Sequence, residues 1–446
     1  MTVAPAPVAG NSLRVLAAQV TGNVGYFVSV LLLARALTTA GRGTVAFVTV
    51  TALLSARVVM LGAGDAAKVL AASRPHARAV VLGNLVATTL VATIAGAALI
   101  VAALALAPSA RPAGVGGIEL VLLALGTLAG ASGVAACAFL QGTSRFREYT
   151  RVLAAAPWVY AVLLAAEWVW HGITVPGALV AWVLAQGGPT VVLWRACLRD
   201  AGLGRPERRL LRETIGFGLR AWTGGLAYLL NARVDQVIVG LIASESTLGV
   251  YAVAVNGSEV LFYVPSAVGV ALLPAIAAGA EDARAERTLR VFRAMVLLTL
   301  AGIALAAVLG PVLIPLLFGP AYQASVTPFL LLLPSAIGFA ANAVFSTALL
   351  ACSAPGLSSL GPLVSLPVGL ALDLALIPPL GASGAAIAAS AALLCGGATA
   401  AVAFGARAGL GLGALVPRAA DLATLTRPLS QLRSRRTARR AGARCS

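Results

Sequence analysis

Charged side chains interrupt apolar stretches that are long enough to cross a membrane. The stretch from Leu229 to Ala278 consists of two such runs, with Arg233 and Asp235 in the first and Glu259 in the second, and an earlier run contains Arg57. A charge in hydrocarbon is costly unless it faces protein or water, so these residues mark a pathway for substrate or ions, or they form ion pairs between helices. An arginine that faces a cavity favours an anionic ligand, and a carboxylate can pair with that arginine.

Uncharged polar residues accompany these charges at helical spacing. Asn256, Glu259 and Tyr263 follow a spacing of i, i+3 and i+7, which would form one stripe on a helix, and Asn23 and Tyr26 share a face of the first run. Such groups suit the wall of a polar cavity, and they equally suit hydrogen bonds between helices. The candidate cavity residues are Arg57, Arg233, Asp235, Glu259, Asn23, Tyr26, Asn256 and Tyr263.

Arg57 belongs to a run from Thr44 to Asp65 that is expected to form the second membrane span. In a continuous helix, Arg57, Leu61, Asp65 and Lys68 follow a spacing of i, i+4, i+8 and i+11, which places them on one face. This spacing puts Arg57 near the middle of the membrane and Asp65 about two turns away. The charged face is either part of a substrate pathway or paired with a carboxylate of a neighbouring helix.

The composition excludes an ordinary soluble globular protein. Of the 446 residues, 60% are hydrophobic and 11% are charged, whereas soluble domains are about half apolar and about a quarter charged. The formal net charge of +17 could indicate nucleic-acid binding, but the arginines cluster in loops between apolar runs, as they do in the cytoplasmic loops of membrane proteins. We therefore expect a multi-pass protein of the cytoplasmic membrane and no nucleic-acid partner.

Signals for an enzyme or a bound cofactor are missing from the sequence. The single lysine, Lys68, stands in GAGDAAKV, which does not match the phosphate-binding loop of ATP-hydrolysing proteins. The two histidines, His76 and His171, lie in or beside loops without a second ligand at metal-binding spacing. Glu167 and Asp373 are expected at the outer ends of their spans, where interfacial water solvates them. We therefore expect no enzymatic activity, no cofactor and no metal site.

About twelve apolar runs of membrane-spanning length predict an all-α integral membrane protein. Lysine and arginine accumulate in alternate connections, which predicts an even number of spans and cytoplasmic termini. The longest internal loop, residues 197–213, separates two expected six-helix lobes at residues 1–196 and 214–406. Residues 407–446 form an arginine-rich cytoplasmic tail, which we expect to be disordered and attracted to anionic lipid headgroups.

The two expected lobes resemble one another in sequence. ARALTTAGRGTVAFV (residues 34–48) parallels VGLIASESTLGVYAVAV (residues 239–255), since each contains a helix end, a short turn and then G-x-x-A. Six spans per repeat give both repeats the same orientation, and substrate sites in transporters of this kind lie where the repeats meet. We therefore expect the first spans of each half to surround the cavity.

Several motifs, taken in order, resemble a known family. They are R-x-D-Q-x-x-x-G from Arg233, L-G-V-Y-A-V-A from Leu248, E-x-L-F-Y-V-P from Glu259, and FLQGTSRFREY and LFGPAYQASVTPFLLLLP elsewhere. The chain to about Phe404 is similar to the polysaccharide flippases of the multidrug/oligosaccharidyl-lipid/polysaccharide (MOP) exporter superfamily. That resemblance implies a MATE-like transporter of two six-helix lobes.

The resemblance also implies a substrate. Such flippases move a polyprenyl-pyrophosphate-linked oligosaccharide from the cytoplasmic to the outer leaflet by alternating access, in contact with membrane lipids, and H⁺ or Na⁺ is the candidate coupling ion. Lipid II flippases usually carry two extra spans and an arginine early in the first helix, which Val24–Leu33 lacks. A multidrug exporter of the superfamily would have an acidic cavity, whereas Arg57 and Arg233 favour an anionic substrate. A membrane polymerase or ligase would need large outer loops, and those expected here are short.

Overall fold

The computed structural model of the protein describes residues 8–108, 111–266, 268–269, 272, 281–352, 354–411 and 413. In these ranges the regular elements are all helices. Eleven of them are long and apolar enough to cross a membrane, and the pair Pro320–Leu332 and Ser335–Ala351, bent by 45°, makes a twelfth if it forms one span. The all-α fold with about twelve spans is therefore confirmed, and the cytoplasmic location of the termini stays a prediction.

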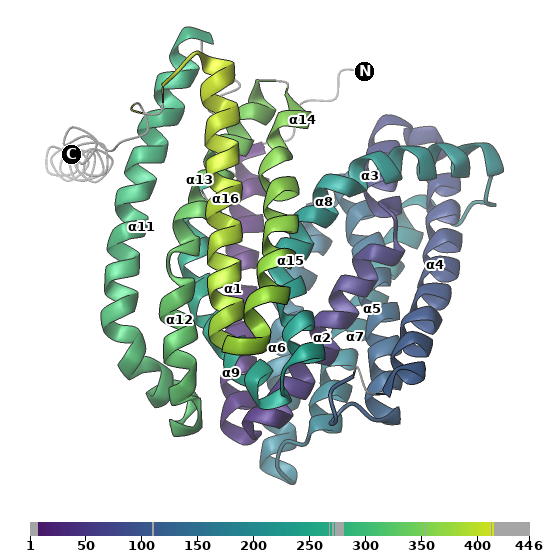
Figure 1. Cartoon of the computed structure of the whole chain (residues 1–446). Helices are drawn as coiled ribbons and strands as arrows, with labels where there is room; N and C mark the ends of the chain where they lie inside the picture. The colour runs from purple at the N-terminus through teal and green to yellow at the C-terminus, as the bar shows by residue number, and fades with distance from the viewer. Residues whose placement is uncertain are drawn as a thin grey trace, which may run out of the picture. The chain divides into compact units, whose positions relative to one another are not determined.

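The helices of the first half follow one another with short connections (Figure 1). They are α1 (Val8–Ala36), α2 (Thr39–Val59), α3 (Ala63–Ser73), α4 (Arg78–Leu106), α5 (Gly117–Gly142), α6 (Phe146–Trp170) and α7 (Val175–Ala201). A short 3₁₀ helix, η1 (Pro75–Ala77), precedes α4.

The helices of the second half are more often interrupted. They are α8 (Arg208–Ile242), α9 (Glu245–Ser258), η3 (Glu259–Phe262), α11 (Glu281–Phe318), η4 (Pro320–Ser325), α12 (Val326–Leu332), α13 (Ser335–Ala351), α14 (Pro355–Ser358), α15 (Leu360–Leu380) and α16 (Ala382–Ala408). The expected tail lies outside the described residues from position 414 onward.

The chain forms two compact units. The first comprises residues 1–256, 312–329 and 370–386, and the second comprises residues 257–311, 330–369 and 387–446. The division into two six-helix lobes stays a prediction.

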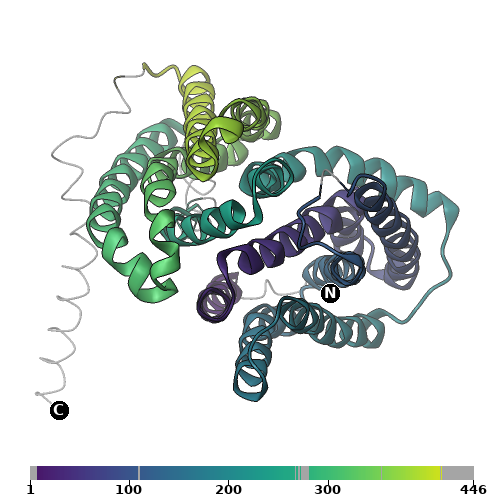
Figure 2. The same ribbon diagram turned by 60° about the horizontal axis from the view of Figure 1, so that its bottom comes forward.

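In the first unit, α5 lies at the centre and packs against α2, α3, α4 and α7, while α1 packs along α6 (Figures 1 and 2). Its largest fully buried side chains include Leu82, Leu85, Phe139 and Leu193, which belong to one hydrophobic cluster. In the second unit, Phe345 of α13 packs between two other rings, with centroids 4.6 Å from Phe292 and 5.3 Å from Phe404.

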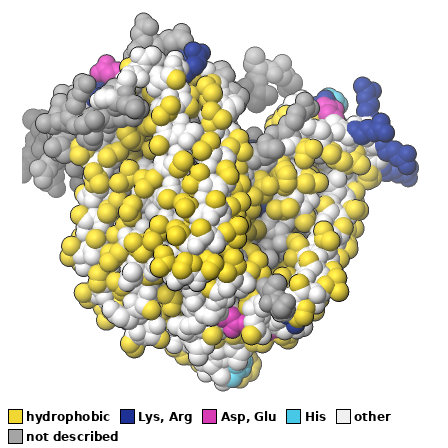
Figure 3. Space-filling view, viewed as in Figure 1, with side chains coloured by type: hydrophobic (Ala, Val, Ile, Leu, Met, Phe, Trp, Pro, Cys, Tyr) yellow, Lys and Arg dark blue, Asp and Glu magenta, His cyan; other side chains and the backbone are white. Residues whose placement is uncertain are grey.

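The surface is apolar along the helices. On the face drawn in Figure 3, hydrophobic side chains cover most of the described area, and the few charged side chains lie near its upper and lower margins. Helix α4 illustrates this, because Val91, Ile94 and Leu99 are all more than half exposed. Side chains of this kind suit contact with lipid rather than water.

The second span is not one helix, so the expectation of a continuous helix through Asp65 was wrong. Helix α2 ends at Val59 and α3 begins at Ala63, and between them Leu61 and Gly62 have φ angles of 44° and 73°. The left-handed conformation suits glycine, which has no Cβ. A Cβ on Gly62 would also overlap the carbonyl of Gly218 in α8, so a close approach of backbones fixes the break.

The stripe expected from Asn256 to Tyr263 is also interrupted. Helix α9 ends at Ser258 and residues Glu259–Phe262 form the 3₁₀ helix η3. A 3₁₀ helix turns about 120° per residue and an α-helix about 100°, so four residues shift the register by about 80°. Asn256, Glu259 and Tyr263 therefore do not form the single α-helical face that their spacing predicts.

Candidate functional site

A cavity of about 590 Å³ lies within the first unit, between helices α2, α3, α5, α6, α7 and α8. Its charged lining residues are Arg57 at the end of α2, and Asp65 and Lys68 on α3. The break at Gly62 does not separate these three residues, because all of them face the same cavity. Two cationic groups and one carboxylate leave the lining with an excess of positive charge.

The end of α2, which carries Arg57, is held by α8. The indole N–H of Trp222 donates a 3.1 Å hydrogen bond to the main-chain carbonyl of Arg57. The last carbonyls of a helix have no partner within it, so this bond satisfies a group that the break would otherwise leave open. Trp222 also lines the cavity, and it therefore orders the backbone from which the guanidinium extends.

The side chains of Arg57, Asp65 and Lys68 are exposed, and no ion pair involves them in the part of the chain that the structure describes. The sequence left a salt bridge to a neighbouring helix as the alternative for Arg57. The structure instead leaves its N–H donors available to a ligand in the cavity.

Uncharged polar groups complete the lining. Gln141 at the end of α5, Tyr149 of α6, and Gln186 and Thr190 of α7 contribute amides and hydroxyls, and Tyr228 of α8 contributes a further phenol. Gln186 and Thr190 are four residues apart and share a face of α7. None of these residues was predicted from the sequence, although two polar residues at i and i+4 in an otherwise apolar span indicate a polar helix face.

Arg57 is the one residue of the predicted set among the described residues that line this cavity. Two others contact one another elsewhere in the first unit, where the Tyr26 hydroxyl donates a 3.3 Å hydrogen bond to Oδ1 of Asn256. This bond joins α1 to α9 and matches the alternative of a hydrogen bond between helices. Asn23 is half-buried on α1.

Asp235 is 7% exposed and lies on α8. Its carboxylate accepts a short hydrogen bond from the Tyr251 hydroxyl of α9 and a 2.8 Å bond from the main-chain N–H of Gln236. Arg233 is half-buried on the same helix, and one of its terminal nitrogens donates to the carbonyl of Ala232 at 3.3 Å. Glu259 is half-buried, and Tyr263 is exposed.

Asp373 of α15 was expected in interfacial water, and this expectation was wrong. It is 3% exposed, and its Oδ1 has no hydrogen-bond partner among the described residues. Asp235, which is also buried, belongs to the same compact unit. Two buried acidic groups are candidate sites for a proton.

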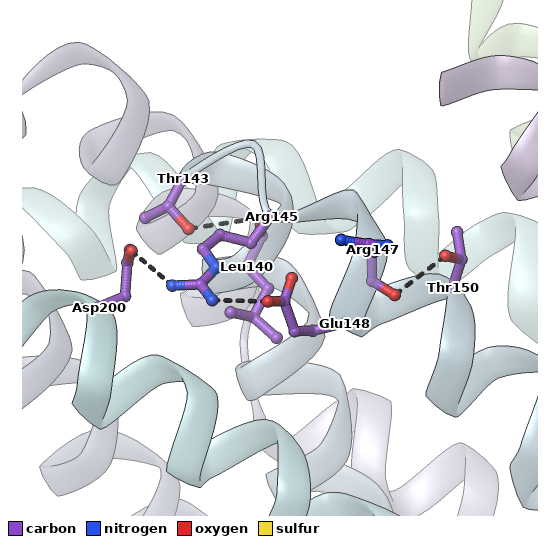
Figure 4. A network of polar contacts seen from close by, with 7 residues as sticks. All are labelled: Leu140, Thr143, Arg145, Arg147, Glu148, Thr150 and Asp200. Atoms are coloured by element: carbon purple, nitrogen blue, oxygen red, sulfur yellow. Dashed lines mark hydrogen bonds and ion pairs between the residues drawn. The ribbon is translucent and has the colours of Figure 1, made fainter. Parts of the chain in front are cut away.

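A network of ion pairs lies beside the cavity, at the ends of α5, α6 and α7 (Figure 4). Arg145 pairs with Glu148 at 2.5 Å and with Asp200 at 3.0 Å. Hydrogen bonds to these two carboxylates raise the pKa of Arg145, so the guanidinium stays charged. Gln141 and Tyr149, which line the cavity, lie four positions before and four positions after Arg145, so the network holds the helix ends that carry them.

A profile of the family described as "Polysaccharide biosynthesis protein" matches residues 32–327, well over half of the chain. The chain belongs to this family. No curated protein sequence matches it significantly. The matched region contains the whole cavity lining, so the charged site lies within the part of the chain that defines the family.

Solved structures show which fold the chain has. It is similar to an inward-facing multidrug resistance MATE family transporter of the MOP superfamily, with a TM-score of 0.67, 14% identity, and 87% of this chain and 94% of that chain covered. It is also similar to the lipid II flippase MurJ in an inward closed conformation, with a TM-score of 0.71, 11% identity, and 88% and 86% covered.

A third structure is a MOP superfamily transporter from Pyrococcus furiosus, with a TM-score of 0.59, 14% identity, and 88% of this chain and 92% of that chain covered. These TM-scores establish a common fold. The chain is therefore a multi-pass membrane protein with the fold of MOP transporters.

Within the described part of the protein, no group of three His, Cys, Asp or Glu side chains could hold a metal ion. Arginine and lysine can bind an anionic group, and the amides and hydroxyls can hydrogen-bond a polyhydroxylated one.

Proposed function

We infer that this protein translocates a polyprenyl-pyrophosphate-linked oligosaccharide across the cytoplasmic membrane. It acts by alternating access, in which a cavity opens first to one side of the membrane and then to the other. The observation that carries the proposal is the cavity with Arg57 and Lys68, both free of ion pairs among the described residues, in a protein of a polysaccharide biosynthesis family.

The lining matches the headgroup of such a substrate. A pyrophosphate is anionic and accepts hydrogen bonds, which Arg57 can donate in pairs and Lys68 as a point charge. Gln141, Gln186 and Tyr149 supply donors and acceptors for sugar hydroxyls. The polyprenyl chain can stay in the lipid, so the cavity needs to accommodate only the polar part.

The other candidate residues extend this proposal. Arg233 is a second phosphate ligand in it, while Asp235 or Glu259 balances the charge or carries a coupling proton. Asn23, Tyr26, Asn256 and Tyr263 are sugar contacts, used when the bond between Tyr26 and Asn256 opens. The coupling ion, H⁺ or Na⁺, belongs to the same proposal, and the burial of the carboxyl groups of Asp235 and Asp373 supports a proton.

A multidrug exporter is the alternative that the shared fold leaves open. Cationic drugs require a negative cavity, whereas this lining carries two cationic groups and one carboxylate. The charge balance therefore favours an anionic substrate.

Transport by Arg57 variants in reconstituted vesicles tests the proposal. The assay measures how fast a polyprenyl-pyrophosphate oligosaccharide becomes accessible to a sugar-modifying reagent on the far side. A charged hydrogen bond contributes about 1.5–3 kcal/mol, so Arg57→Ala should lower the rate at limiting substrate by roughly tenfold or more. Arg57→Lys should retain part of the activity, and Arg147→Ala, an exposed arginine outside the cavity, should behave as wild type.

Two results would contradict the proposal. One is an Arg57→Ala protein that is present at wild-type level and moves the glycolipid at the wild-type rate. The other is transport of a cationic drug, with no movement of the glycolipid, by the wild-type protein in the same vesicles. That second outcome would show that the cavity serves the export of cationic drugs.

A further inference from the structure

A second cavity, of about 300 Å³, lies on the outside of the first unit between α4, α5 and α7. Its lining includes Val86, Thr89, Leu90 and Thr93 of α4, with Trp194 and Leu198 of α7. Val86, Leu90 and Thr93 lie at i, i+4 and i+7 and share a face, so the groove follows α4 for about 10 Å. Leu90 and Leu198 are 55% and 43% exposed, which shows that the groove opens at the surface.

Most of the groove lining is apolar, and one of its hydroxyls lacks a hydrogen-bond partner among the described residues. The indole N–H of Trp194 is satisfied by Ser132 at 2.7 Å, and the hydroxyl of Thr93 donates to the carbonyl of Thr89 at 2.5 Å. The hydroxyl of Thr89 has no hydrogen-bond partner among the described residues, and the residue is only 4% exposed, so water does not replace the missing partner. Buried hydroxyls are normally paired, so this group indicates a missing acceptor or donor.

One end of the groove is closed by the linker between α7 and α8. The side-chain amide of Asn84 donates to the carbonyl of Glu207 at 3.2 Å and accepts from its N–H at 2.9 Å, and the N–H of Gly204 donates to the carbonyl of Ala79 at 2.9 Å. These bonds pin the linker against the start of α4. They hold Leu203, which is 63% exposed, at the edge of the groove.

Two arginines, Arg199 at the end of α7 and Arg205 in the linker, lie close in sequence to this end of the groove, next to the carboxylates Asp200 and Glu207. Arg199 follows the lining residue Leu198, and Arg205 lies two positions after Leu203, and both arginines are exposed. A groove for a hydrocarbon chain therefore ends beside cationic side chains. Basic pockets between membrane helices on the cytoplasmic side bind the headgroups of anionic lipids.

We propose that this groove binds an anionic phospholipid of the bilayer, with an acyl chain along α4 and the headgroup phosphate at Arg199 and Arg205. The Thr89 hydroxyl donates a hydrogen bond to an ester oxygen of the lipid. The inference does not rest on the proposed transport function, since it needs only a membrane-spanning chain with this groove. The site differs from that of the transported lipid, because the groove and the charged cavity have no lining residue in common, although α5 and α7 border both.

Native mass spectrometry of the full-length protein in detergent tests the proposal. The protein is titrated with phosphatidylglycerol and, separately, with phosphatidylcholine that has the same acyl chains. The wild type should retain phosphatidylglycerol preferentially. Removing both arginines, as in Arg199→Gln with Arg205→Gln, should weaken phosphatidylglycerol binding by about fivefold for each residue and leave phosphatidylcholine unaffected.

Two variants in the groove test the chain and the hydroxyl. Val86→Trp fills the groove and should abolish retention, whereas Val91→Trp, on the lipid-exposed side of the same helix, is the matched control and should not. Thr89→Val keeps the shape and should weaken binding by about threefold through the lost hydrogen bond. The double arginine variant changes only exposed side chains, so it tests the site even if Val86→Trp fails to fold.

Three outcomes would overturn the proposal. They are equal retention of both lipids by the wild type, unchanged phosphatidylglycerol binding in the double arginine variant, and tighter binding of a polyprenyl phosphate that Val86→Trp removes. The last result would show that the groove binds the polyprenyl tail of the transported lipid. None of these three measurements depends on whether Arg57→Ala transports the glycolipid, so the two proposals can fail separately.

Discussion

Gly43 of α2 and Gly249 of α9 contact each other's helix reciprocally. A Cβ on Gly43 would overlap the carbonyl of Glu245, and a Cβ on Gly249 would overlap the carbonyl of Thr39. Each glycine thus faces the residue four positions before the other, and the hydroxyls of Thr39 and Ser246 lie 2.8 Å apart at the same junction. The two glycines lie in the two segments that resemble one another in sequence. The internal repeat is therefore matched by a reciprocal, two-fold contact within the first unit.

Substituting either glycine should destabilise the protein. Gly43→Ala and Gly249→Ala each push a methyl group into a backbone carbonyl that cannot rotate away, and overpacking typically costs about 1–3 kcal/mol. Thermal unfolding in detergent should show a lower midpoint for both. Gly187→Ala in α7 is the control, because a Cβ there meets nothing within 4 Å, and its midpoint should equal or exceed that of the wild type. Equal midpoints for all three variants would show that the junction is not tightly packed.

The break between α2 and α3 gives a second prediction. Gly62→Ala should be more harmful than Gly64→Ala, although the two residues are neighbours in sequence. Gly62 has a positive φ and lies against Gly218, whereas a Cβ on Gly64 meets its nearest atom, the Cβ of Ala138, at an ordinary 3.4 Å. The left-handed conformation alone costs an alanine about 1–2 kcal/mol.

Because Gly62 also sets the direction of α3, its substitution should reduce transport by moving Asp65 and Lys68. The measurement is the vesicle transport rate per folded protein, judged by monodisperse elution, for the two variants side by side. A Gly62→Ala protein as active and as stable as Gly64→Ala would show that the break does not position these side chains.

The network around Arg145 predicts a modest, salt-dependent stabilisation. A double-mutant cycle with Arg145→Gln and Asp200→Asn should give a coupling free energy of about 0.5–1 kcal/mol, because both side chains are partly exposed and solvent screens the pair. The coupling should shrink in about 1 M salt, where the screening length is about 3 Å. A cycle with the pair Arg290 and Glu286, more exposed at 51% and 74%, should give a smaller coupling.

The pH dependence of this network follows from the raised pKa of Arg145. A group whose pKa is raised on folding stabilises the protein below its unfolded pKa and loses that contribution only as pH rises through the folded value. For an arginine this lies above about pH 12, so the coupling should be constant through the neutral and alkaline range. It should fall only in acid, when the carboxylates gain protons. A coupling that declined between neutral and mildly alkaline pH would contradict this assignment.

The sequence alone determined that the protein is helical and spans a membrane, because hydropathy is a local property summed along about twenty residues. It also identified Arg57, Asp65 and Lys68 as charges that hydrocarbon would not tolerate. It did not predict that the helix between them breaks, because the break depends on the approach of Gly218, more than 150 positions later.

Only the tertiary structure decided which polar side chains share a space. Gln141, Gln186 and Trp222 come from three helices and meet Arg57 in one cavity, while Tyr26 and Asn256 bond to each other instead. Asp373, expected in water, is buried. The physical reason is that burial of a polar group is determined by the faces of neighbouring helices, and helix packing depends on contacts between residues far apart in the chain.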